Sequence, residues 1–262
     1  MRAIILAAGK GKRLDTVSGD NPKCLLDIGG VSLIERQIEI IRAAGIDDIT
    51  AVVGFGAEHV RERCGSGISY IENEIHDQTN SLYSLWLARH ALSEGFVVLN
   101  ADVLFHSQLL VDLLSVQFED ALLVSYEPLG MLGDEEMKVK VRKGCVVDMS
   151  KQMNPAEADG ENVGIVKFGS SGAALLVELM DTLVEAGNRR EWAPRAFREF
   201  AAQRPLSAIS TRGYPWIEID FPEDYRRAVD EIFPDLIQSD RLEMSRPCAV
   251  ESHVSSYTEL KT

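Results

Sequence analysis

The feature that most constrains this chain is its first 23 residues, in which a short apolar stretch runs into a turn of glycines and cations. Residues 3–8 are apolar and predict a buried strand. Gly9 and Gly11 follow this strand. Because glycine has no side chain, backbone N–H groups at such a turn can approach a ligand closely. A turn of this kind at the end of a strand favours the binding of phosphate groups.

Four cations accompany these glycines, namely Lys10, Lys12, Arg13 and Lys23. Positively charged side chains form strong charge-assisted hydrogen bonds with phosphate oxygens. Pro22 fixes its own φ and restricts the residue before it, so the backbone that carries Lys23 is stiff. The segment therefore predicts a site that holds a nucleoside triphosphate and polarises one of its phosphates.

Length and charge limit the classes of protein to consider. The chain has 262 residues, of which 45% are apolar and 26% charged, as expected for one large or two small globular domains. Its formal net charge of −14 disfavours nucleic acids and anionic membrane surfaces as partners. Residues 1–30, in contrast, carry a net charge of +2. A basic loop on an acidic body suits a small anionic ligand, although chance clustering explains this pattern equally well.

The cysteines and the apolar runs indicate the compartment. Cys24, Cys64, Cys145 and Cys248 are scattered, so neither a disulfide framework nor a zinc site is indicated. The first apolar run is too short for a signal peptide. No stretch approaches the ~18 apolar residues that a membrane span requires. We therefore expect a cytoplasmic protein without a nucleic-acid or membrane partner. The sequence is compatible with a homodimer.

Strands and helices alternate through the first half of the chain. Apolar runs predict strands at residues 3–8, 49–53, 68–71, 96–99 and 121–126, and the helical period predicts helices at residues 32–44, 58–64, 80–91 and 107–114. This alternation predicts an α/β fold of βαβ units, with a largely parallel sheet that helices cover on both faces. Ligands bind beyond the carboxyl ends of such strands. Gly9 and Asp102, which follow two of them, are therefore expected to share one crevice.

The second half differs in pattern. Residues 138–149 predict a hairpin that turns at Lys143 and Gly144, and Pro222 is expected to open a helix that ends at Ile232. We expect a single domain over residues 1–233, with a hairpin insertion near residues 130–168. Residues 234–262 form a C-terminal tail whose serine-rich composition favours loose order over an arm that packs on a partner subunit.

Three acids follow the ends of predicted strands. Asp102 comes after the strand at 96–99, and Glu218 and Asp220 are two residues apart, which places them on the same face of a strand. Carboxylate oxygens are the ligands that Mg²⁺ prefers. Each acid alone is explained as well by a helix cap or a turn. Together they predict a Mg²⁺ site beside the triphosphate.

The glycine turn differs from two common phosphate-binding motifs. It lacks the G-K-[ST] of a P-loop, and Leu14 stands where a dinucleotide-binding motif has its third glycine, which disfavours a dinucleotide-dependent oxidoreductase. The string L-A-A-G-x-G-x-R-L from Leu6 to Leu14, with Pro22-Lys23 downstream, resembles the nucleotidyltransferases of the nucleotide-diphospho-sugar transferase type. This resemblance implies their Rossmann-like three-layer αβα fold, with a mixed, mostly parallel sheet, for most of the chain.

Two further segments resemble the bacterial cytidylyltransferases that act on phosphocholine and their relatives that act on phosphonates. They are the E-x-D sequence at residues 218–220 and the segment at 72–85, which contains N-S-L-Y-S-L. The resemblance implies that the metal ligands are Asp102, Glu218 and Asp220, and we expect Lys23 and Arg13 to act in catalysis. Nucleotide contacts are expected from Leu6, Ala7, Ala8, Gly9, Lys10, Gly11, Asn80, Ser81 and Ala101. Of these, Asn80 and Ser81 either read the base or only cap a helix.

The acceptor site is less well defined by the sequence. Residues 148–151 and 160–165 resemble motifs of the same group, which implies that the insertion near residues 130–168 binds the acceptor. Aromatic residues suit a quaternary ammonium on that acceptor. The sequence R-R-E-W-A at 189–193 departs from the phosphocholine enzymes, which tend to carry further aromatic and acidic residues there, and this disfavours choline itself. The arginines suit an extra negative charge on the acceptor or simply begin a solvated helix. Acceptor contacts are expected from Tyr126, Lys151, Glu161, Arg190 and Trp192.

This resemblance implies an enzyme that transfers CMP from CTP to a small acceptor and releases pyrophosphate, with Mg²⁺ as cofactor. The acceptor is a phosphonate such as 2-aminoethylphosphonate or phosphonoformate, or it is phosphocholine. One alternative is a sugar-1-phosphate or polyol-phosphate nucleotidyltransferase that uses another nucleoside triphosphate. An alternative of another class is a nucleotide-binding regulatory module without turnover.

Overall fold

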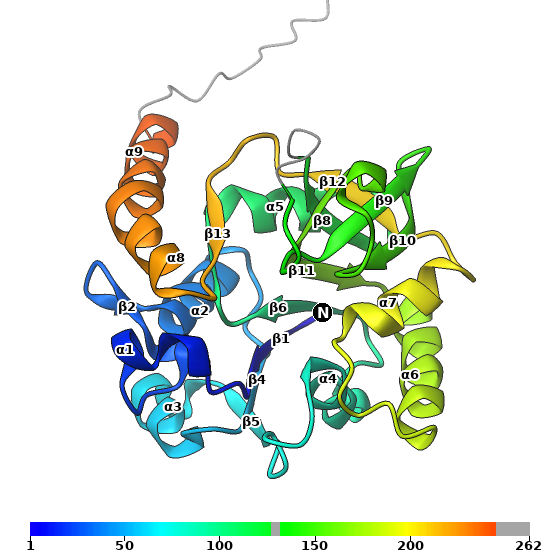
Figure 1. The fold of residues 1–262 in the computed structure, drawn as a ribbon, viewed down its shortest axis with the longest axis horizontal. Coiled ribbons are helices and arrows are strands. Elements are labelled where there is room, and N and C mark those ends of the chain that lie inside the picture. The colour runs from blue at the N-terminus through cyan, green and yellow to red at the C-terminus, as the bar shows by residue number, and fades with distance from the viewer. Residues whose placement is uncertain (127–131, 245–262) are drawn as a thin grey trace, which may run out of the picture.

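The computed structural model describes residues 1–126 and 132–244 (Figure 1). Its main sheet consists of β1 (Arg2–Ala7), β4 (Ile49–Val53), β5 (Ser69–Glu72), β6 (Phe96–Asn100), β8 (Ala121–Ser125), β9 (Lys138–Arg142), β10 (Cys145–Ser150), β11 (Gly160–Phe168) and β12 (Ser207–Ser210). The strand order is β5-β4-β1-β6-β11-β8-β12-β10-β9. Parallel pairing joins β5, β4, β1 and β6, as the alternation predicted, whereas β11 pairs antiparallel with both β6 and β8. The sheet is therefore mixed.

Helices cover both faces of this sheet (Figure 1). Neighbouring residues of β1 face opposite layers: Ile5 packs in the same core cluster as residues of three helices, and Ile4 packs with residues of three others. The first set is α2 (Leu33–Ala43), α3 (Ala57–Cys64) and α5 (Ser107–Ser115). The second set is α4 (Ser81–Leu87), α6 (Ser170–Glu185) and α7 (Pro194–Ala201). The predicted three-layer αβα architecture is confirmed.

A smaller layer covers the side of the glycine turn. It contains the ribbons β2 (Asp27–Ile28) with β3 (Val31–Ser32) and β7 (Val103–Phe105) with β13 (Trp216–Glu218), the short helix α1 (Asp15–Ser18), and the C-terminal helical run. That run is α8 (Pro222–Arg227), a π-helical segment (Ala228–Ile232) and α9 (Phe233–Met244). Single turns of 3₁₀ helix occupy Lys12–Leu14, Lys23–Leu25, Gly65–Gly67, Arg89–Ala91 and Pro155–Glu157.

The C-terminal helical run corrects the expected boundary at residue 234. Helix α9 continues the run without a break, and Leu236 is buried in one cluster with Leu14 and Leu26. Leu236 gains this burial from residues far away along the chain, which composition alone does not reveal. Residues 245–262 of the expected tail, and residue 130 at the expected start of the insertion, lie outside the described residues. The predicted hairpin is confirmed as β9 and β10.

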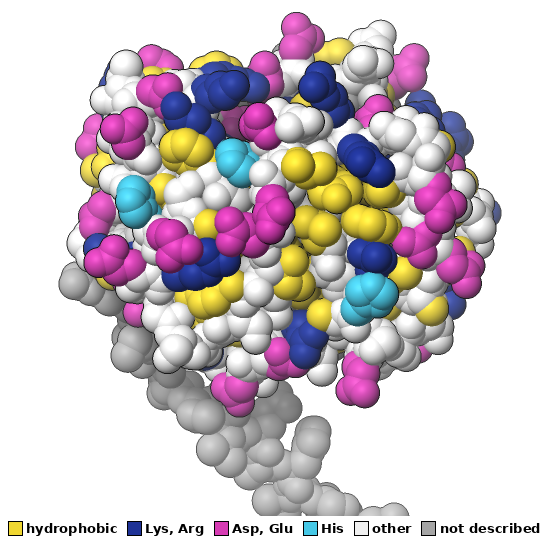
Figure 2. All heavy atoms as spheres, turned by 90° about the horizontal axis from the view of Figure 1, so that it is seen from below, with side chains coloured by type: hydrophobic (Ala, Val, Ile, Leu, Met, Phe, Trp, Pro, Cys, Tyr) yellow, Lys and Arg dark blue, Asp and Glu magenta, His cyan; other side chains and the backbone are white. Residues whose placement is uncertain are grey.

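Charged side chains of both signs lie on the surface of the protein. In Figure 2, lysine and arginine side chains are interspersed with aspartate and glutamate around a group of hydrophobic side chains. Among the described residues, no helix is both long enough and apolar enough to cross a bilayer.

Candidate active site

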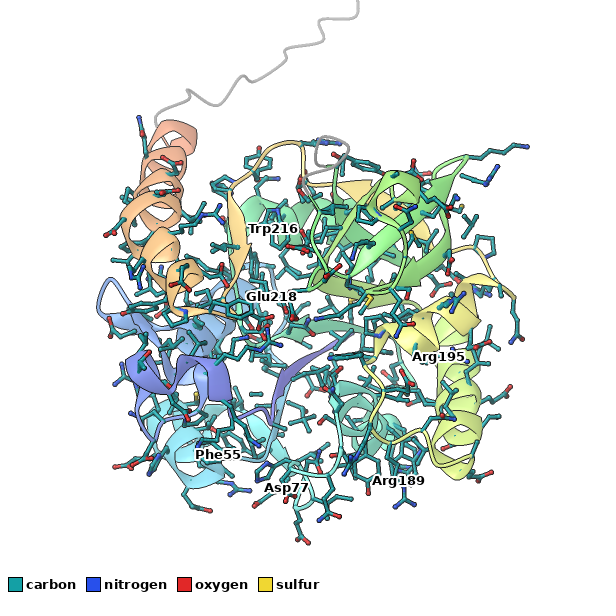
Figure 3. All side chains as sticks on the ribbon, viewed as in Figure 1. Phe55, Asp77, Arg189, Arg195, Trp216 and Glu218 are labelled. Atoms are coloured by element: carbon teal, nitrogen blue, oxygen red, sulfur yellow. The ribbon has the colours of Figure 1, made fainter. Side chains whose placement is uncertain are left out.

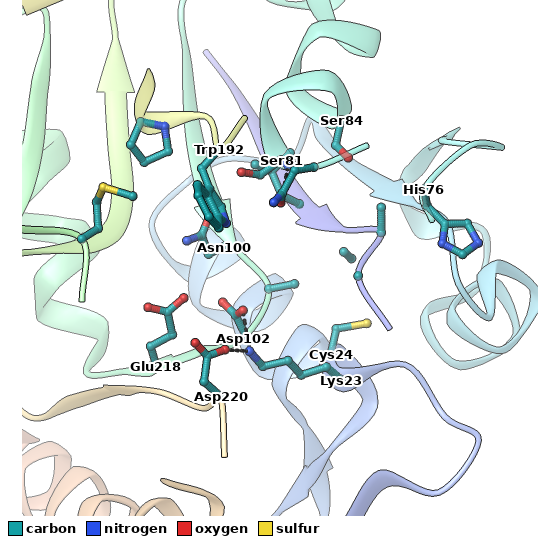
Figure 4. Close-up of a pocket in the computed structure, with 18 of the residues that line it drawn as sticks. Lys23, Cys24, His76, Ser81, Ser84, Asn100, Asp102, Trp192, Glu218 and Asp220 are labelled. Atoms are coloured by element: carbon teal, nitrogen blue, oxygen red, sulfur yellow. Dashed lines mark hydrogen bonds and ion pairs between the residues drawn. The ribbon is translucent and has the colours of Figure 1, made fainter. Parts of the chain in front are cut away.

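Lys23 lies at the centre of a cluster of carboxylates beside the glycine turn (Figure 4). Lys23 follows Pro22 and begins a single turn of 3₁₀ helix, and only 8% of the residue is exposed. The Lys23 Nζ donates to Asp102 Oδ2 at 2.8 Å and also forms an ion pair with Asp220 Oδ1. The convergence of this lysine with acids from two distant segments, predicted from the sequence, is confirmed.

A short antiparallel ribbon brings the distant acids together. Strand β13 pairs with β7, so that Glu218 lies opposite Val103, and the Ile219 N–H donates to the Asp102 carbonyl at 3.0 Å. Asp102 follows the end of β6 and precedes β7. Figure 3 shows Trp216 and Glu218 along β13 near the middle of the molecule, whereas Arg189 lies at its edge. The ribbon therefore places the E-x-D sequence against the carboxyl end of the main sheet.

The cluster strongly perturbs the charges of its members. Burial raises the pKa of Glu218 to about 8, and the negative charges of Asp102 and Asp220 add to this effect. Burial alone would lower the pKa of Lys23, but the surrounding carboxylates outweigh burial and raise it above its ordinary value. Burial opposes ionisation of Asp220 as well, yet the Lys23 ammonium holds the pKa of that carboxyl below its ordinary value. A charged lysine thus faces carboxylates that repel one another.

The same three acids fit a divalent cation. One oxygen from each of Asp102, Glu218 and Asp220 lies within 4.8 Å of the others. Asp102 Oδ1 is buried and has no hydrogen-bond partner among the described residues. A buried carboxylate oxygen without a donor or a cation is unfavourable. A set of carboxylate oxygens of this kind has the chemistry that Mg²⁺ requires.

A cavity at the carboxyl ends of β1 and β6 contains most of the predicted nucleotide contacts. Its lining includes Leu6, Ala7, Ala8, Gly9, Arg13, Lys23, Asn80, Ser81, Ala101 and Asp102. Two predicted residues have other surroundings. The Lys10 ammonium lies 5.2 Å from the centre of the Phe55 ring and 3.6 Å from Asp15. Gly11 has a φ of +72°, and a Cβ on it would lie 2.8 Å from the Lys23 Cβ. Gly11 therefore makes room for Lys23.

Asn80 caps α4, which is one of the two roles that the sequence left open, whereas Ser81 is the first residue of that helix. The Asn80 Oδ1 accepts a hydrogen bond from the Ser81 N–H at 2.8 Å. The Ser81 Oγ in turn accepts one from the Ala193 N–H at 2.9 Å. The sequence did not single out several other polar residues that line this cavity, which are Asn73, His76, Thr79, Ser84, Asn100 and Asn162. The first four lie within the segment at 72–85 and Asn162 lies within the segment at 160–165, so the resemblance of these segments to the cytidylyltransferases was the available signal.

A second cavity, of about 320 Å³, adjoins the first at Glu218 and Asp220. It is strongly acidic, with a lining of Leu132, Glu135, Glu136, Glu161, Trp216, Ile217, Glu218, Asp220, Phe221, Asp224 and Arg227. Of the predicted acceptor residues, Glu161 lines this cavity, and Lys151 and Trp192 line the first one.

The two remaining predicted acceptor residues line neither cavity. Tyr126 is 46% exposed directly after β8, and the Arg190 Nε donates to the Gln78 carbonyl at 3.3 Å. Lys151 lines the first cavity and lies close to Glu135 of the second. Its Nζ is 5.1 Å from the centre of the Trp192 ring and 3.6 Å from Glu135 Oε2, and the same oxygen accepts from Arg13 at 3.2 Å.

Comparisons with known proteins agree with this geometry. Residues 3–132 match the family described as the MobA-like NTP transferase domain. This part of the chain is a MobA-like NTP transferase domain. The bifunctional IPC transferase and DIPP synthase of Rubrobacter xylanophilus is 30% identical over 230 residues, which cover 86% of this chain and 50% of that protein. This chain thus spans about half the length of that curated relative.

Two cytidylyltransferases match over most of their own length. The CTP:phosphoglutamine cytidylyltransferase of Campylobacter jejuni is 24% identical over 255 residues, which cover 88% of this chain and 100% of that protein. The solved structure of the CTP:phosphocholine cytidylyltransferase from Streptococcus pneumoniae superposes with a TM-score of 0.69 at 22% sequence identity. It covers 87% of this chain and 97% of that one. The nucleotide-diphospho-sugar transferase fold implied by the sequence is confirmed.

Proposed function

We propose that this protein is a Mg²⁺-dependent cytidylyltransferase that transfers CMP from CTP to a small phosphonate or phosphate acceptor and releases pyrophosphate. The observation that carries this proposal is the enclosure of the Lys23 ammonium by Asp102 and Asp220 beside the glycine turn. The names of the two similar cytidylyltransferases support CTP as the nucleotide.

The side chains suit in-line transfer. An oxygen of the acceptor forms a bond to the α-phosphorus of CTP while the bond to pyrophosphate breaks. The acceptor oxygen is already ionised near neutral pH, so the reaction needs alignment and charge stabilisation rather than a general base. Lys23 stays protonated because its pKa is raised, and it would neutralise the charge that builds on the α-phosphate. Arg13 and the backbone N–H groups near Gly9 would hold the β- and γ-phosphates.

Asp102, Glu218 and Asp220 would hold Mg²⁺ through their converging oxygens. When bound there, the ion would supply positive charge to the phosphates of the nucleotide and the acceptor. The unpaired Asp102 Oδ1 supports this assignment, because a cation would satisfy it.

The second cavity favours an acceptor that carries an amine. Six acidic side chains line it, of which Glu218 has a raised pKa, and Arg227 is the single cation among the lining residues. Such surroundings attract the ammonium of 2-aminoethylphosphonate or phosphocholine and repel the additional carboxylate of phosphonoformate. Trp216 offers an aromatic face to a cation in the same cavity. Lys151, which lines the first cavity, would pair with the phosphonate or phosphate group.

A panel of four nucleoside triphosphates against several acceptors, read by pyrophosphate release, tests the proposal. We expect turnover with CTP and an amine-bearing phosphonate or phosphate. Turnover with another triphosphate and a sugar or polyol phosphate would establish the alternative enzyme. CTP binding without pyrophosphate release across the whole panel would indicate a regulatory module instead.

A further inference from the structure

Asn73 occupies a rigid position in the wall of the nucleotide cavity. It follows β5 directly and is only 1% exposed. Its N–H donates to the Val53 carbonyl at 2.8 Å, and its own carbonyl accepts from the His76 N–H at 3.2 Å. The backbone on either side of this side chain is therefore held in place.

The hydrogen bonds around Asn73 also fix which way its amide group points. The Asn73 Nδ2 donates to Thr79 Oγ1 at 2.9 Å and to Ser84 Oγ at 3.1 Å. Thr79 uses its own hydroxyl hydrogen to donate to the Ile75 carbonyl at 3.0 Å. Because a threonine hydroxyl has one hydrogen, Thr79 can only accept from Asn73. The amino end of the amide must face Thr79, and the carbonyl end must face elsewhere.

That carbonyl end is an unused acceptor. Asn73 Oδ1 is buried and has no partner among the described residues. Buried polar atoms are almost always hydrogen-bonded, so an acceptor held in a fixed direction beside a cavity indicates that a ligand supplies the donor.

The position of Asn73 identifies which part of a nucleotide would supply this donor. Its partner Ser84 lies on α4, and Figure 4 shows Ser84 on the other side of the cavity from Asp102, Glu218 and Asp220. The acids and Lys23 mark the place of the phosphates. The base therefore extends towards α4. Asn80 and Ser81 also lie there, but their side-chain oxygens already serve α4 and the Ala193 N–H.

We infer that Asn73 Oδ1 accepts a hydrogen bond from the 4-amino group of cytosine and thereby selects CTP over UTP. This inference rests on the proposed use of CTP. Uracil carries a carbonyl oxygen where cytosine carries this amine, so two acceptors would face each other and the buried oxygen would stay unpaired. A site built to pair with a donor strongly rejects an analogue that lacks it.

The test compares kcat/KM for CTP, UTP and the triphosphate of 4-deaminated cytidine (the pyrimidin-2-one nucleoside, which lacks the amine). For the unmodified protein we expect CTP to be preferred over both. The Asn73→Ala variant should lose about 10- to 100-fold with CTP, as expected when a buried hydrogen bond is removed, and change little with the other two. The preference of CTP over the deaminated analogue should then disappear.

Asn162→Ala is the matched control, since Asn162 lines the same cavity but its Oδ1 already accepts from the Gly164 N–H at 3.1 Å. We expect it to leave the ratio between CTP and the analogue unchanged. Because each result is a ratio within one variant, a loss of folded protein cancels. If the ratio of kcat/KM between CTP and the deaminated analogue is the same in the unmodified protein and in Asn73→Ala, the inference is wrong. The proposed function would still stand in that case, provided that the protein turns over CTP. A chain that prefers another triphosphate would instead overturn the proposed function as well.

Discussion

Replacing Lys23 with methionine tests the centre of the site most directly. Methionine keeps the apolar stem and removes the ammonium, so Asp102 and Asp220 lose the cation that now pairs with both of them. Removing one partner of a fully buried ion pair costs about 3–5 kcal/mol. Here the two carboxylates keep 25% and 27% of their side-chain surface exposed, so we expect a loss of about 2–3 kcal/mol in the metal-free protein.

The same substitution should have an opposite effect on metal binding. The ammonium and Mg²⁺ compete for the same carboxylate oxygens, so removing the ammonium should tighten Mg²⁺ binding even as it lowers stability. Turnover should fall by about 10²–10³, the usual effect of removing one group that stabilises developing charge. Mg²⁺ should therefore stabilise Lys23→Met against unfolding more than it stabilises the unmodified protein, without restoring its rate.

The assays are urea unfolding with and without Mg²⁺, and steady-state pyrophosphate release. Lys140→Met is the matched control for stability, since the Lys140 Nζ lies 3.7 Å from Glu157 in a partly exposed pair. Such a pair contributes about 0–1 kcal/mol. If Lys23→Met keeps the rate of the unmodified protein, or if it unfolds at the same urea concentration without metal, the proposed role of this lysine is refuted.

Three further results are expected. In metal-free protein, ionisation of Glu218 should lower the stability of the fold as the pH rises from the ordinary pKa of a glutamate towards about 8. Glu218→Gln should therefore raise the midpoint of thermal unfolding relative to the unmodified protein at pH 8 but not at pH 5. Equal differences at both pH values would contradict this. Gly11→Ala should lower kcat, because Gly11 has a positive φ and a Cβ on it would displace Lys23. Gly19→Ala is the control and should not lower kcat, because Gly19 also has a positive φ but no atom lies within 4 Å of the added Cβ. Equal kcat values for the two variants would argue against the packing role of Gly11. Glu161→Gln should raise KM for an amine-bearing acceptor and leave KM for CTP unchanged, which initial-rate measurements would show; a change in the CTP value alone would place Glu161 on the nucleotide side.

The sequence predicted the parts of the site that depend on strand order. Gly9 and Asp102 were expected to share a crevice because the carboxyl ends of parallel strands meet at one edge, and both residues line one cavity. The approach of Glu218 and Asp220 depends instead on the three-residue pairing of β13 with β7, which lies outside the main sheet. No periodicity along the chain encodes that pairing, so the expectation rested on the positions of the acids after predicted strands and on the resemblance.

Other features depend on contacts that sequence patterns do not contain. The direction of the Asn73 amide follows from a hydrogen bond between Thr79 and Ile75, so the recognised segment alone did not reveal it. The acidity of the second cavity arises where Glu135, Glu161 and Asp224 meet from separate segments. Neighbouring residues along the chain give no sign of that meeting.

The sequence separation within the ion-pair cluster has a consequence for biosynthesis. Lys23 and Asp220 are 197 positions apart, and residues 3–132 include the lysine and Asp102 but neither Glu218 nor Asp220. A nascent chain of which only the amino-terminal half has emerged would contain the glycine turn, Lys23 and Asp102, but it would lack Glu218 and Asp220. The complete ion-pair cluster can therefore form only late in translation, after β13 has left the ribosome and paired with β7.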